Sequence, residues 1–217
     1  MAWWTEKRIA FYERAQEASP FTSQLADLIE PCLTGSIAEL GCGLGFMTDE
    51  LRRRGHVVTG YDTDPLALAY ARSHFPLSSF SGEDCYSLKD VADTSLAVFF
   101  GRPTVDDNLT RLMDTCTQRL VYIANEHADA AQCDWHISAS TEAFLKDRGC
   151  RFTAKRCSLS FDQPLLDEVE LAEWTQENYT RRGRTLTRPV SRRTQLWPIV
   201  VECGKAFTIF IIEKKRN

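Results

Sequence analysis

Hydrophobic and polar positions follow two different periods along this chain, and the switches between them predict strands and helices in alternation. Short apolar runs that end at glycine, proline or an acid are typical of buried strands, and apolar residues three or four positions apart are typical of amphipathic helices. The predicted strands are 37–40, 56–61, 78–81, 95–100, 119–125, 152–161 and 205–212. The predicted helices are 1–20, 21–29, 44–54, 64–74, 105–118, 140–148 and 165–179. This order predicts an α/β fold with a parallel sheet between two layers of helices.

Residues 162–204 interrupt this alternation. They contain an acidic helix (165–179), a segment with six arginines and no acid (181–193), and an apolar run (197–201). We interpret the region as an insertion before the last strand, within a single domain of 217 residues. The other parts of that domain are expected to be N-terminal cap helices (1–34), a ligand-binding core (35–161) and the final strand (205–217).

The run from Ile37 to Gly45 combines a short strand, an acid and three alternating glycines, Gly41, Gly43 and Gly45. Glycine is needed where the backbone takes a positive φ or where a ligand lies directly against it. The amides of the following helix would then face that ligand with the positive end of the helix dipole. Glu39 would repel a pyrophosphate from this loop. The pattern therefore predicts a ligand that carries a cationic group at this end.

Acids also follow the second and third predicted strands, at Asp62 and Asp84. A carboxylate has two acceptor oxygens, so Asp62 can bind both hydroxyls of a nucleoside ribose, and Asp84 can accept a hydrogen bond from an adenine amine. The alternatives are an acid at a helix start for Asp62 and an exposed loop acid for Asp84. Ligands of parallel sheets bind at the carboxyl ends of the strands. We therefore expect residues 41–45, 62, 84, 100–101 and 125–127 to converge.

In these features the sequence resembles the class I S-adenosylmethionine-dependent methyltransferases, and in particular the branch that acts on small molecules. Residues 37–45 resemble the first motif of that superfamily. Residues 58–65 (Val-Thr-Gly-Tyr-Asp-Thr-Asp-Pro) resemble the second motif, and residues 81–85 (Ser-Gly-Glu-Asp-Cys) resemble the segment that contacts adenine. The resemblance covers residues 35–160 and, more loosely, the last strand.

The resemblance implies a Rossmann-like three-layer sandwich, in which a seven-stranded sheet is mostly parallel and the last strand is antiparallel beside the sixth. It also implies that the cofactor is S-adenosyl-L-methionine. The methionine end would lie near Glu39 and the glycine loop, the ribose at Asp62 and the adenine at Asp84. The implied cofactor-binding residues are Glu39, Gly41, Cys42, Gly43, Gly45, Asp62, Thr63, Asp84, Cys85 and Phe100.

Methyl transfer from a sulfonium requires alignment of the nucleophile, the methyl carbon and the sulfur, with water kept out. A base is needed only when the nucleophile carries a proton. His127, after the fifth strand, is the candidate catalytic base, and a structural role is its alternative. The fourth strand ends in Phe-Phe-Gly-Arg-Pro (99–103). Enzymes that methylate nucleobases or glutamine often have Asn-Pro-Pro-Tyr there, so this difference favours a small-molecule acceptor.

The candidate substrate-binding residues are Trp4, Tyr12 and Arg181. An N-terminal helix often covers the site in this superfamily, and the arginines of 181–193 offer planar donors for a carboxylate or phosphate. An anionic acceptor is therefore one expectation. The alternatives are that Trp4 and Tyr12 only pack their helix, and that the arginines pair with nearby acids. Those acids are Asp167, Glu168, Glu170, Glu173 and Glu177.

Two other functions compete with a methyltransferase. An NAD(P)-binding oxidoreductase of the Rossmann type would favour a further glycine at the position of Phe46, and it would gain nothing from Glu39. A non-catalytic subunit that binds the same cofactor would share every motif above, so a turnover assay is needed to separate it from an enzyme.

The composition narrows the class of protein further. A hydrophobic content of 43% is ordinary for a globular domain, and a net charge of −4 argues against a general nucleic-acid or membrane-surface binder. No apolar run approaches the roughly 18 residues that a membrane span needs, and the first residues lack a signal core, so we expect a cytoplasmic protein. The eight cysteines are scattered without a CxxC pair, which indicates reduced thiols and no metal site.

Overall fold

The computed structural model describes residues 3–99, 106–126, 137–179, 185–186, 190–191, 193 and 196–214. The chain divides into two compact units. The core unit comprises Leu25–Ser158 with Ala206–Asn217, and the small unit comprises Met1–Gln24 with Leu159–Lys205. Within the described residues, no helix is both long and apolar enough to cross a bilayer.

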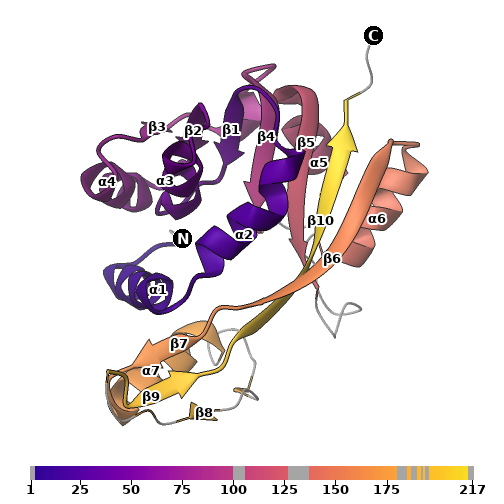
Figure 1. Cartoon of the computed structure of the whole chain (residues 1–217). Helices are drawn as coiled ribbons and strands as arrows, with labels where there is room; N and C mark the ends of the chain where they lie inside the picture. Colours follow the sequence, from indigo (N-terminus) through magenta and orange to yellow (C-terminus); the bar gives the residue numbers. More distant parts are fainter. Residues whose placement is uncertain are drawn as a thin grey trace. The chain divides into compact units, whose positions relative to one another are not determined.

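The core unit is built on a seven-stranded sheet with the order β3-β2-β1-β4-β5-β10-β6 (Figure 1). Its strands are β1 (Ile37–Leu40), β2 (Val58–Tyr61), β3 (Ser79–Ser81), β4 (Ala92–Val98), β5 (Cys116–Asn125), β6 (Phe152–Ser160) and β10 (Gly204–Glu213). Strands β3, β2, β1, β4 and β5 pair in parallel, whereas β10 runs antiparallel to β5, with Phe207 opposite Asn125. The predicted Rossmann-like sheet, with an antiparallel last strand next to the sixth, is confirmed.

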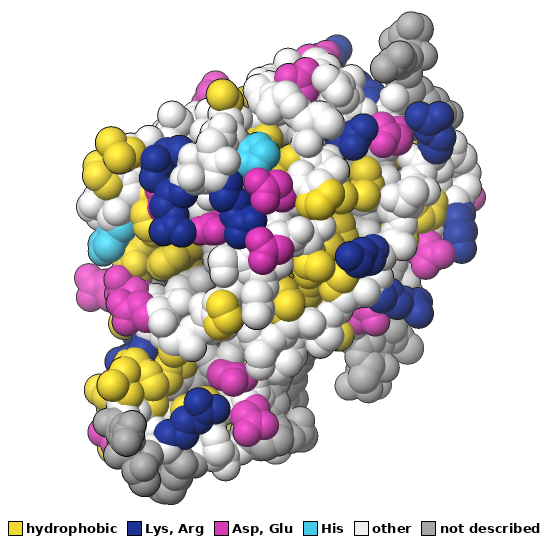
Figure 2. Space-filling model, in the orientation of Figure 1, with side chains coloured by type: hydrophobic (Ala, Val, Ile, Leu, Met, Phe, Trp, Pro, Cys, Tyr) yellow, Lys and Arg dark blue, Asp and Glu magenta, His cyan; other side chains and the backbone are white. Residues whose placement is uncertain are grey.

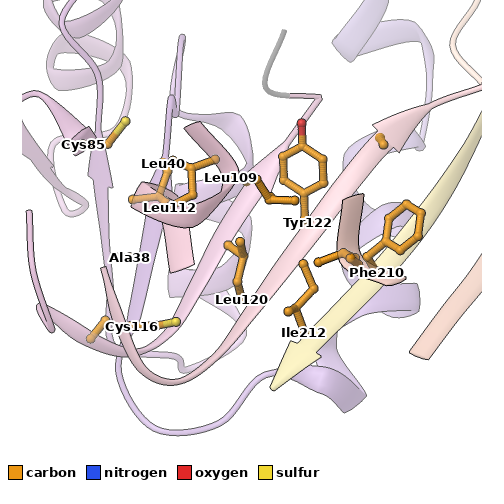
Figure 3. Packing of buried hydrophobic residues seen from close by; sticks show 14 residues of the cluster. Ala38, Leu40, Cys85, Leu109, Leu112, Cys116, Leu120, Tyr122, Phe210 and Ile212 are labelled. Atoms are coloured by element: carbon orange, nitrogen blue, oxygen red, sulfur yellow. The ribbon is translucent and has the colours of Figure 1, made fainter. Parts of the chain in front are cut away.

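Helices cover both faces of this sheet. They are α2 (Phe21–Ile29), α3 (Phe46–Arg53), α4 (Pro65–His74), α5 (Asp106–Asp114) and α6 (Ser138–Asp147). Successive strand residues point to opposite faces. Ala38 and Leu40 of β1 lie in a buried cluster with Leu109 of α5 and Leu145 of α6 (Figure 3). Glu39, between them, points to the other face and meets α3. The three predicted layers are therefore present.

The fourth and fifth strands begin earlier than the sequence indicates, at Ala92 and Cys116. One of the additional residues, Thr94, is polar but buried, and buried polar groups must find hydrogen-bond partners. The Thr94 hydroxyl donates to the Thr34 carbonyl at 2.8 Å, and the Ser95 and Thr115 hydroxyls bond to each other. Because these partners lie in other segments of the chain, the polar residues can enter the sheet.

The small unit has its own three-stranded antiparallel sheet, with the order β7-β9-β8. Its elements are α1 (Glu6–Ala18), β7 (Gln163–Leu165), α7 (Glu168–Asn178), β8 (Val190–Ser191) and β9 (Ile199–Val201). Its hydrophobic core consists of Phe11, Leu165, Trp174, Ile199, Val201 and Cys203. The N-terminal helix and the insertion therefore share one core, although they lie at opposite ends of the sequence.

Helix α7 begins later than the predicted helix 165–179. Its N-cap is Asp167, whose Oδ1 accepts a hydrogen bond from the Glu170 amide at 2.8 Å. An acid at the N-cap satisfies amides that the helix itself leaves open. Leu165 is thereby left outside the helix, and it is fully buried in β7.

Ion pairs join α1 to α7. The pairs are Lys7–Glu173 at 2.9 Å, Arg8–Glu177 at 3.4 Å, and Arg14–Glu170. Three of the acids that could have neutralised the arginines of 181–193 are therefore already paired with basic residues of α1.

Candidate functional site

The glycine loop connects β1 to α3 and contains three positive φ angles, 70° at Gly41, 53° at Gly43 and 83° at Gly45. Side chains other than hydrogen are strained in this region of φ. Gly45 has a second constraint, because a Cβ on it would lie 2.7 Å from Cζ of Phe80. The loop is tied to the next strand, since the Gly41 amide donates to the Tyr61 carbonyl at 2.8 Å. The alternating glycines thus serve a backbone path that other residues would strain.

Glu39 is a buried acid directly below this loop, with only 3% of its surface exposed. The hydroxyl of Thr48, in α3, donates a hydrogen bond to Glu39 Oε2. Burial raises the pKa of Glu39 to about 8; the nearby charge of Asp62 adds to this, and the hydrogen bonds from Thr48 oppose it. A buried carboxylate is stable only with a counter-charge or strong donors. The site therefore favours a ligand that brings a cation to Glu39.

Asp62 follows β2 and joins two loops. Its Oδ2 accepts from the Gly43 amide at 2.8 Å, and its Oδ1 accepts from the Asp64 amide at 2.8 Å. Each carboxylate oxygen has a further lone pair for a ligand. Glu39, Gly43 and Asp62 are thus brought together at the carboxyl ends of β1 and β2, as the sequence predicts.

Asp64, two residues later, has the capping role expected of it. Its Oδ1 accepts from the amides of Leu66 at 3.0 Å and Ala67 at 3.3 Å at the start of α4. Thr63, between the two acids, is exposed. Of the two neighbouring acids, Asp62 binds the glycine loop and Asp64 caps a helix.

Asp84 lies in the loop after β3. It is exposed, and its Oδ1 accepts from the Tyr86 amide at 3.0 Å at the start of a short 3-10 turn, Cys85–Ser87. The Cys85 side chain is buried in the core cluster, so a ligand would meet its backbone rather than its thiol. Cys42, in the glycine loop, is buried as well, and burial together with the charges of Glu39 and Asp62 raises the pKa of its thiol. Neither thiol is placed to react.

The remaining site predictions fall in two groups. Phe100, His127 and Arg181 lie outside the described residues. Trp4 and Tyr12 lie in the small unit, where their rings pack edge to face with centroids 5.4 Å apart.

The small unit also holds a cavity of about 340 Å³, and none of the predicted site residues lines it. It is lined by Glu17, Ala18, Asp162, Pro164, Arg193, Leu196, Trp197 and Val200.

Two residues of the site, Thr48 and Gly60, were not predicted from the sequence. Thr48 is fully buried, and a Cβ on Gly60 of β2 would lie 2.6 Å from its hydroxyl oxygen. Gly60 therefore makes room for the side chain that holds Glu39. The sequence offers one signal for this, a threonine on the otherwise apolar buried face of α3, where its hydroxyl would need a partner.

Glu126, directly after β5, makes contacts that connect neighbouring strands. Its Oε1 accepts from the Thr208 hydroxyl at 2.8 Å and lies 3.1 Å from Nε of Arg156. These contacts link β5 to β10 and β6. No group of three or more potential metal ligands occurs among the described side chains, and the seven described cysteines are free thiols.

Comparison with protein families gives one match, a methyltransferase domain over residues 38–102. This segment contains the glycine loop, Asp62 and Asp84. No curated protein matches the chain.

Similar solved structures include the magnesium protoporphyrin IX methyltransferase of Synechocystis PCC 6803 with bound S-adenosylmethionine. It has a TM-score of 0.51 at 12% identity, over 95% of this chain and 81% of that one. The YcgJ protein of Bacillus subtilis has a TM-score of 0.60 at 12% identity, over 89% of this chain and 99% of that one. A protein of Pyrococcus horikoshii put forward as an RNA methyltransferase has a TM-score of 0.56 at 13% identity, over 92% of this chain and 85% of that one.

At these identities the structural likeness establishes the fold, and the match over residues 38–102 establishes the type of domain. An all-parallel dinucleotide-binding sheet would lack the antiparallel β10 between β5 and β6. The chain therefore contains the sequence features of a methyltransferase domain at residues 38–102, and its sheet has the Rossmann-like topology with an antiparallel β10.

Proposed function

We propose that this protein transfers the methyl group of S-adenosylmethionine to a small-molecule acceptor. The observation that carries the proposal is the convergence of Glu39, the glycine loop and Asp62 at one edge of the sheet. Glu39 offers a negative charge to the amino group of the methionine end, and Asp62 keeps lone pairs for the ribose hydroxyls. Asp84 and the backbone at Cys85 are proposed to meet the adenine, with Thr63 and Phe100 beside it.

The bound cofactor supplies an activated methyl carbon on a sulfonium. The chain's own residues hold the donor in place, so that an acceptor atom can lie in line with the methyl group, and they keep water away. One of the residues proposed to hold the donor, Asp62, is itself oriented by hydrogen bonds from the Gly43 and Asp64 amides. His127 remains the proposed base for an acceptor that must lose a proton.

The charge distribution supports a small acceptor rather than a nucleic acid. On the face shown in Figure 2, basic side chains lie among acidic ones. Arg54, for example, pairs with Asp27, Glu30 and Glu50. Binding along a nucleic-acid backbone requires a continuous basic surface instead.

We further propose that the acceptor carries an anionic group that Arg181 and neighbouring arginines recognise. Three acids of α7, Glu170, Glu173 and Glu177, are paired with α1. The support for this proposal is the planar donor groups of the arginines, which match a carboxylate or phosphate. Trp4 and Tyr12 are proposed to contact the apolar part of the acceptor. We also propose a cytoplasmic location, which the free thiols of the described cysteines support.

Two measurements test the proposal. Isothermal titration should show binding of S-adenosylmethionine and S-adenosylhomocysteine, but not of NAD; the reverse result would identify an oxidoreductase. The protein should then convert tritiated S-adenosylmethionine to S-adenosylhomocysteine in the presence of a small-metabolite extract. Donor binding without turnover on any extract would favour a non-catalytic subunit, and turnover only on RNA would contradict the small-molecule acceptor.

A further inference from the structure

Glu39 is buried among groups that do not neutralise it. Among the described residues, its side-chain hydrogen bond comes from the Thr48 hydroxyl. No lysine, arginine or histidine of the described part of the chain forms an ion pair with it. Because an ionised carboxyl without a counter-charge is costly to bury, this acid holds its proton when no ligand is bound.

The charged groups around Glu39 strengthen this effect. Asp62 approaches from the loop after β2, and its negative charge raises the pKa of Glu39 further. The Cys42 thiol, in the glycine loop, is close enough for the charges of both acids to raise its pKa. Arg72, in α4, has only a weak opposing effect on the pKa of the Cys42 thiol. The surroundings of Glu39 therefore carry net negative charge.

Thr48 is held in one place by the fold. Its side chain is fully buried, and its hydroxyl occupies the space that Gly60 leaves open in β2. The hydroxyl can donate only one hydrogen bond, and Glu39 receives it. Its position is therefore set by α3 and β2 together, and it fixes the orientation of the Glu39 carboxyl.

We propose that the methyl donor binds together with the release of one proton from Glu39, and that Thr48 is the positioning residue that holds the carboxyl for this exchange. The inference rests on the proposed function, since it takes the donor's α-ammonium group as the cation that reaches Glu39. The O–H bond of the carboxyl breaks, the proton passes to solvent, and the carboxylate pairs with the ammonium. The raised pKa of about 8 agrees with this geometry.

The release of a proton makes the affinity depend on pH. At pH values below the pKa of Glu39 in the free protein, each increase of one pH unit should strengthen donor binding about tenfold. The reason is that the proton is then a product of the binding reaction. The sulfonium plays no part in this dependence. S-Adenosylhomocysteine, which has the ammonium but no sulfonium, should behave in the same way, whereas 5′-methylthioadenosine, which has no amino-acid end, should not.

Isothermal titration at pH 6.5 in two buffers of different ionisation enthalpy measures the number of protons released. We expect a value close to one for S-adenosylhomocysteine and close to zero for 5′-methylthioadenosine. Glu39→Gln should reduce the number of protons released by S-adenosylhomocysteine binding to zero. It should leave the affinity for 5′-methylthioadenosine unchanged, and this unchanged affinity also shows that the variant is folded. Equal proton release for both ligands, or none for either, would overturn the inference.

The role of Thr48 is tested with a pair of matched variants. Thr48→Val keeps the shape and removes the hydroxyl, so it should weaken S-adenosylhomocysteine binding roughly tenfold at pH 6.5 and leave 5′-methylthioadenosine binding unchanged. Thr48→Ser keeps the hydroxyl and should restore most of the affinity. Equal effects on both ligands would assign Thr48 a merely structural role. If S-adenosylhomocysteine does not bind at all, the proposed function fails and this inference fails with it.

Discussion

The carboxylate of Asp62 accepts a hydrogen bond from the amide of Gly43 across 2.8 Å. These residues are 19 positions apart, and both of their loops lie within the segment that matches a methyltransferase domain, residues 38–102. Gly43 has a positive φ of 53°, a conformation that glycine adopts without strain. The bond thus joins the two motifs that are proposed to hold opposite ends of one ligand.

Asp62→Ala should weaken S-adenosylhomocysteine binding by about ten- to a hundred-fold, because a charged acceptor for the ribose hydroxyls is lost. It should also lower the free energy of unfolding by about 1–3 kcal/mol, since two backbone amides lose their acceptor. Titration calorimetry and urea denaturation measure the two effects. Asp64→Ala is the matched control and should affect stability alone. An unchanged dissociation constant for Asp62→Ala would reduce Asp62 to a structural acid.

Glu39→Gln should make the protein more stable than the wild type, and increasingly so as the pH rises. The pKa of Glu39 is raised from 4.5 to about 8, so between these pH values the unfolded chain binds fewer protons than the folded one. Wild-type stability is therefore fully present below pH 4.5 and is lost progressively up to about pH 8. Glutamine does not titrate, so the gain should reach a few kcal/mol, on the order of the full pKa shift. Urea denaturation of both proteins at pH 5 and pH 8.5 measures this gain in the free energy of unfolding. A difference between variant and wild type that is the same at both pH values would contradict the prediction.

Gly45→Ala should destabilise the glycine loop through two effects, backbone strain and a steric clash. The φ of Gly45 is 83°, and a Cβ would lie 2.7 Å from Phe80 and 3.0 Å from Ala71. Gly55 separates the two effects, because its φ is 92° but nothing lies within 4 Å of the added Cβ. Gly55→Ala should cost about 1 kcal/mol, and Gly45→Ala clearly more, as measured by thermal unfolding. Similar losses for both variants would mean that Phe80 moves aside without cost.

Glu170→Gln should destabilise the small unit more than Glu173→Gln does. The side chains of Arg14 and Glu170 are 18% and 21% exposed, and both guanidinium nitrogens contact the carboxylate. The Lys7–Glu173 pair is 48% and 42% exposed. Bidentate pairs with little exposure are stronger than exposed single contacts, so we expect a loss of roughly 1–2 kcal/mol for the first variant and less than about 0.5 kcal/mol for the second. Hydrogen exchange of α1 and α7 amides reports on this unit; equal protection in the two variants would contradict the ranking.

Local features of the fold were predictable because their causes are local. The strand, turn and helix at residues 37–53, the positive φ angles of the glycines and the Asp64 cap all follow from residues within a few positions of one another. The convergence of Glu39 and Asp62 was also predictable, since parallel strands present their carboxyl ends at one edge. The antiparallel last strand came from the resemblance to a known superfamily, and the sheet order confirms it.

The sequence was less informative where distant segments meet. The early start of β4 depends on hydroxyl partners such as Thr34, 60 residues away from Thr94. The sheet of the small unit pairs Gln163 with Val201, and its core includes Phe11 from the N-terminal helix. Propensity and periodicity describe only one segment at a time, so neither feature was visible in advance.

The sequence by itself determined the succession of elements, the glycine loop and the acids that follow β1 and β2, because each is set by backbone sterics and by the alternation of side chains along a strand. Only the tertiary structure decided that Thr48 would bond to Glu39, that Gly60 would leave space for it, and that the acids of α7 would pair with α1. These contacts join residues on separate elements, and their formation depends on how the elements pack. The same packing removes water from Glu39 and raises its pKa, which no property of the isolated sequence could do.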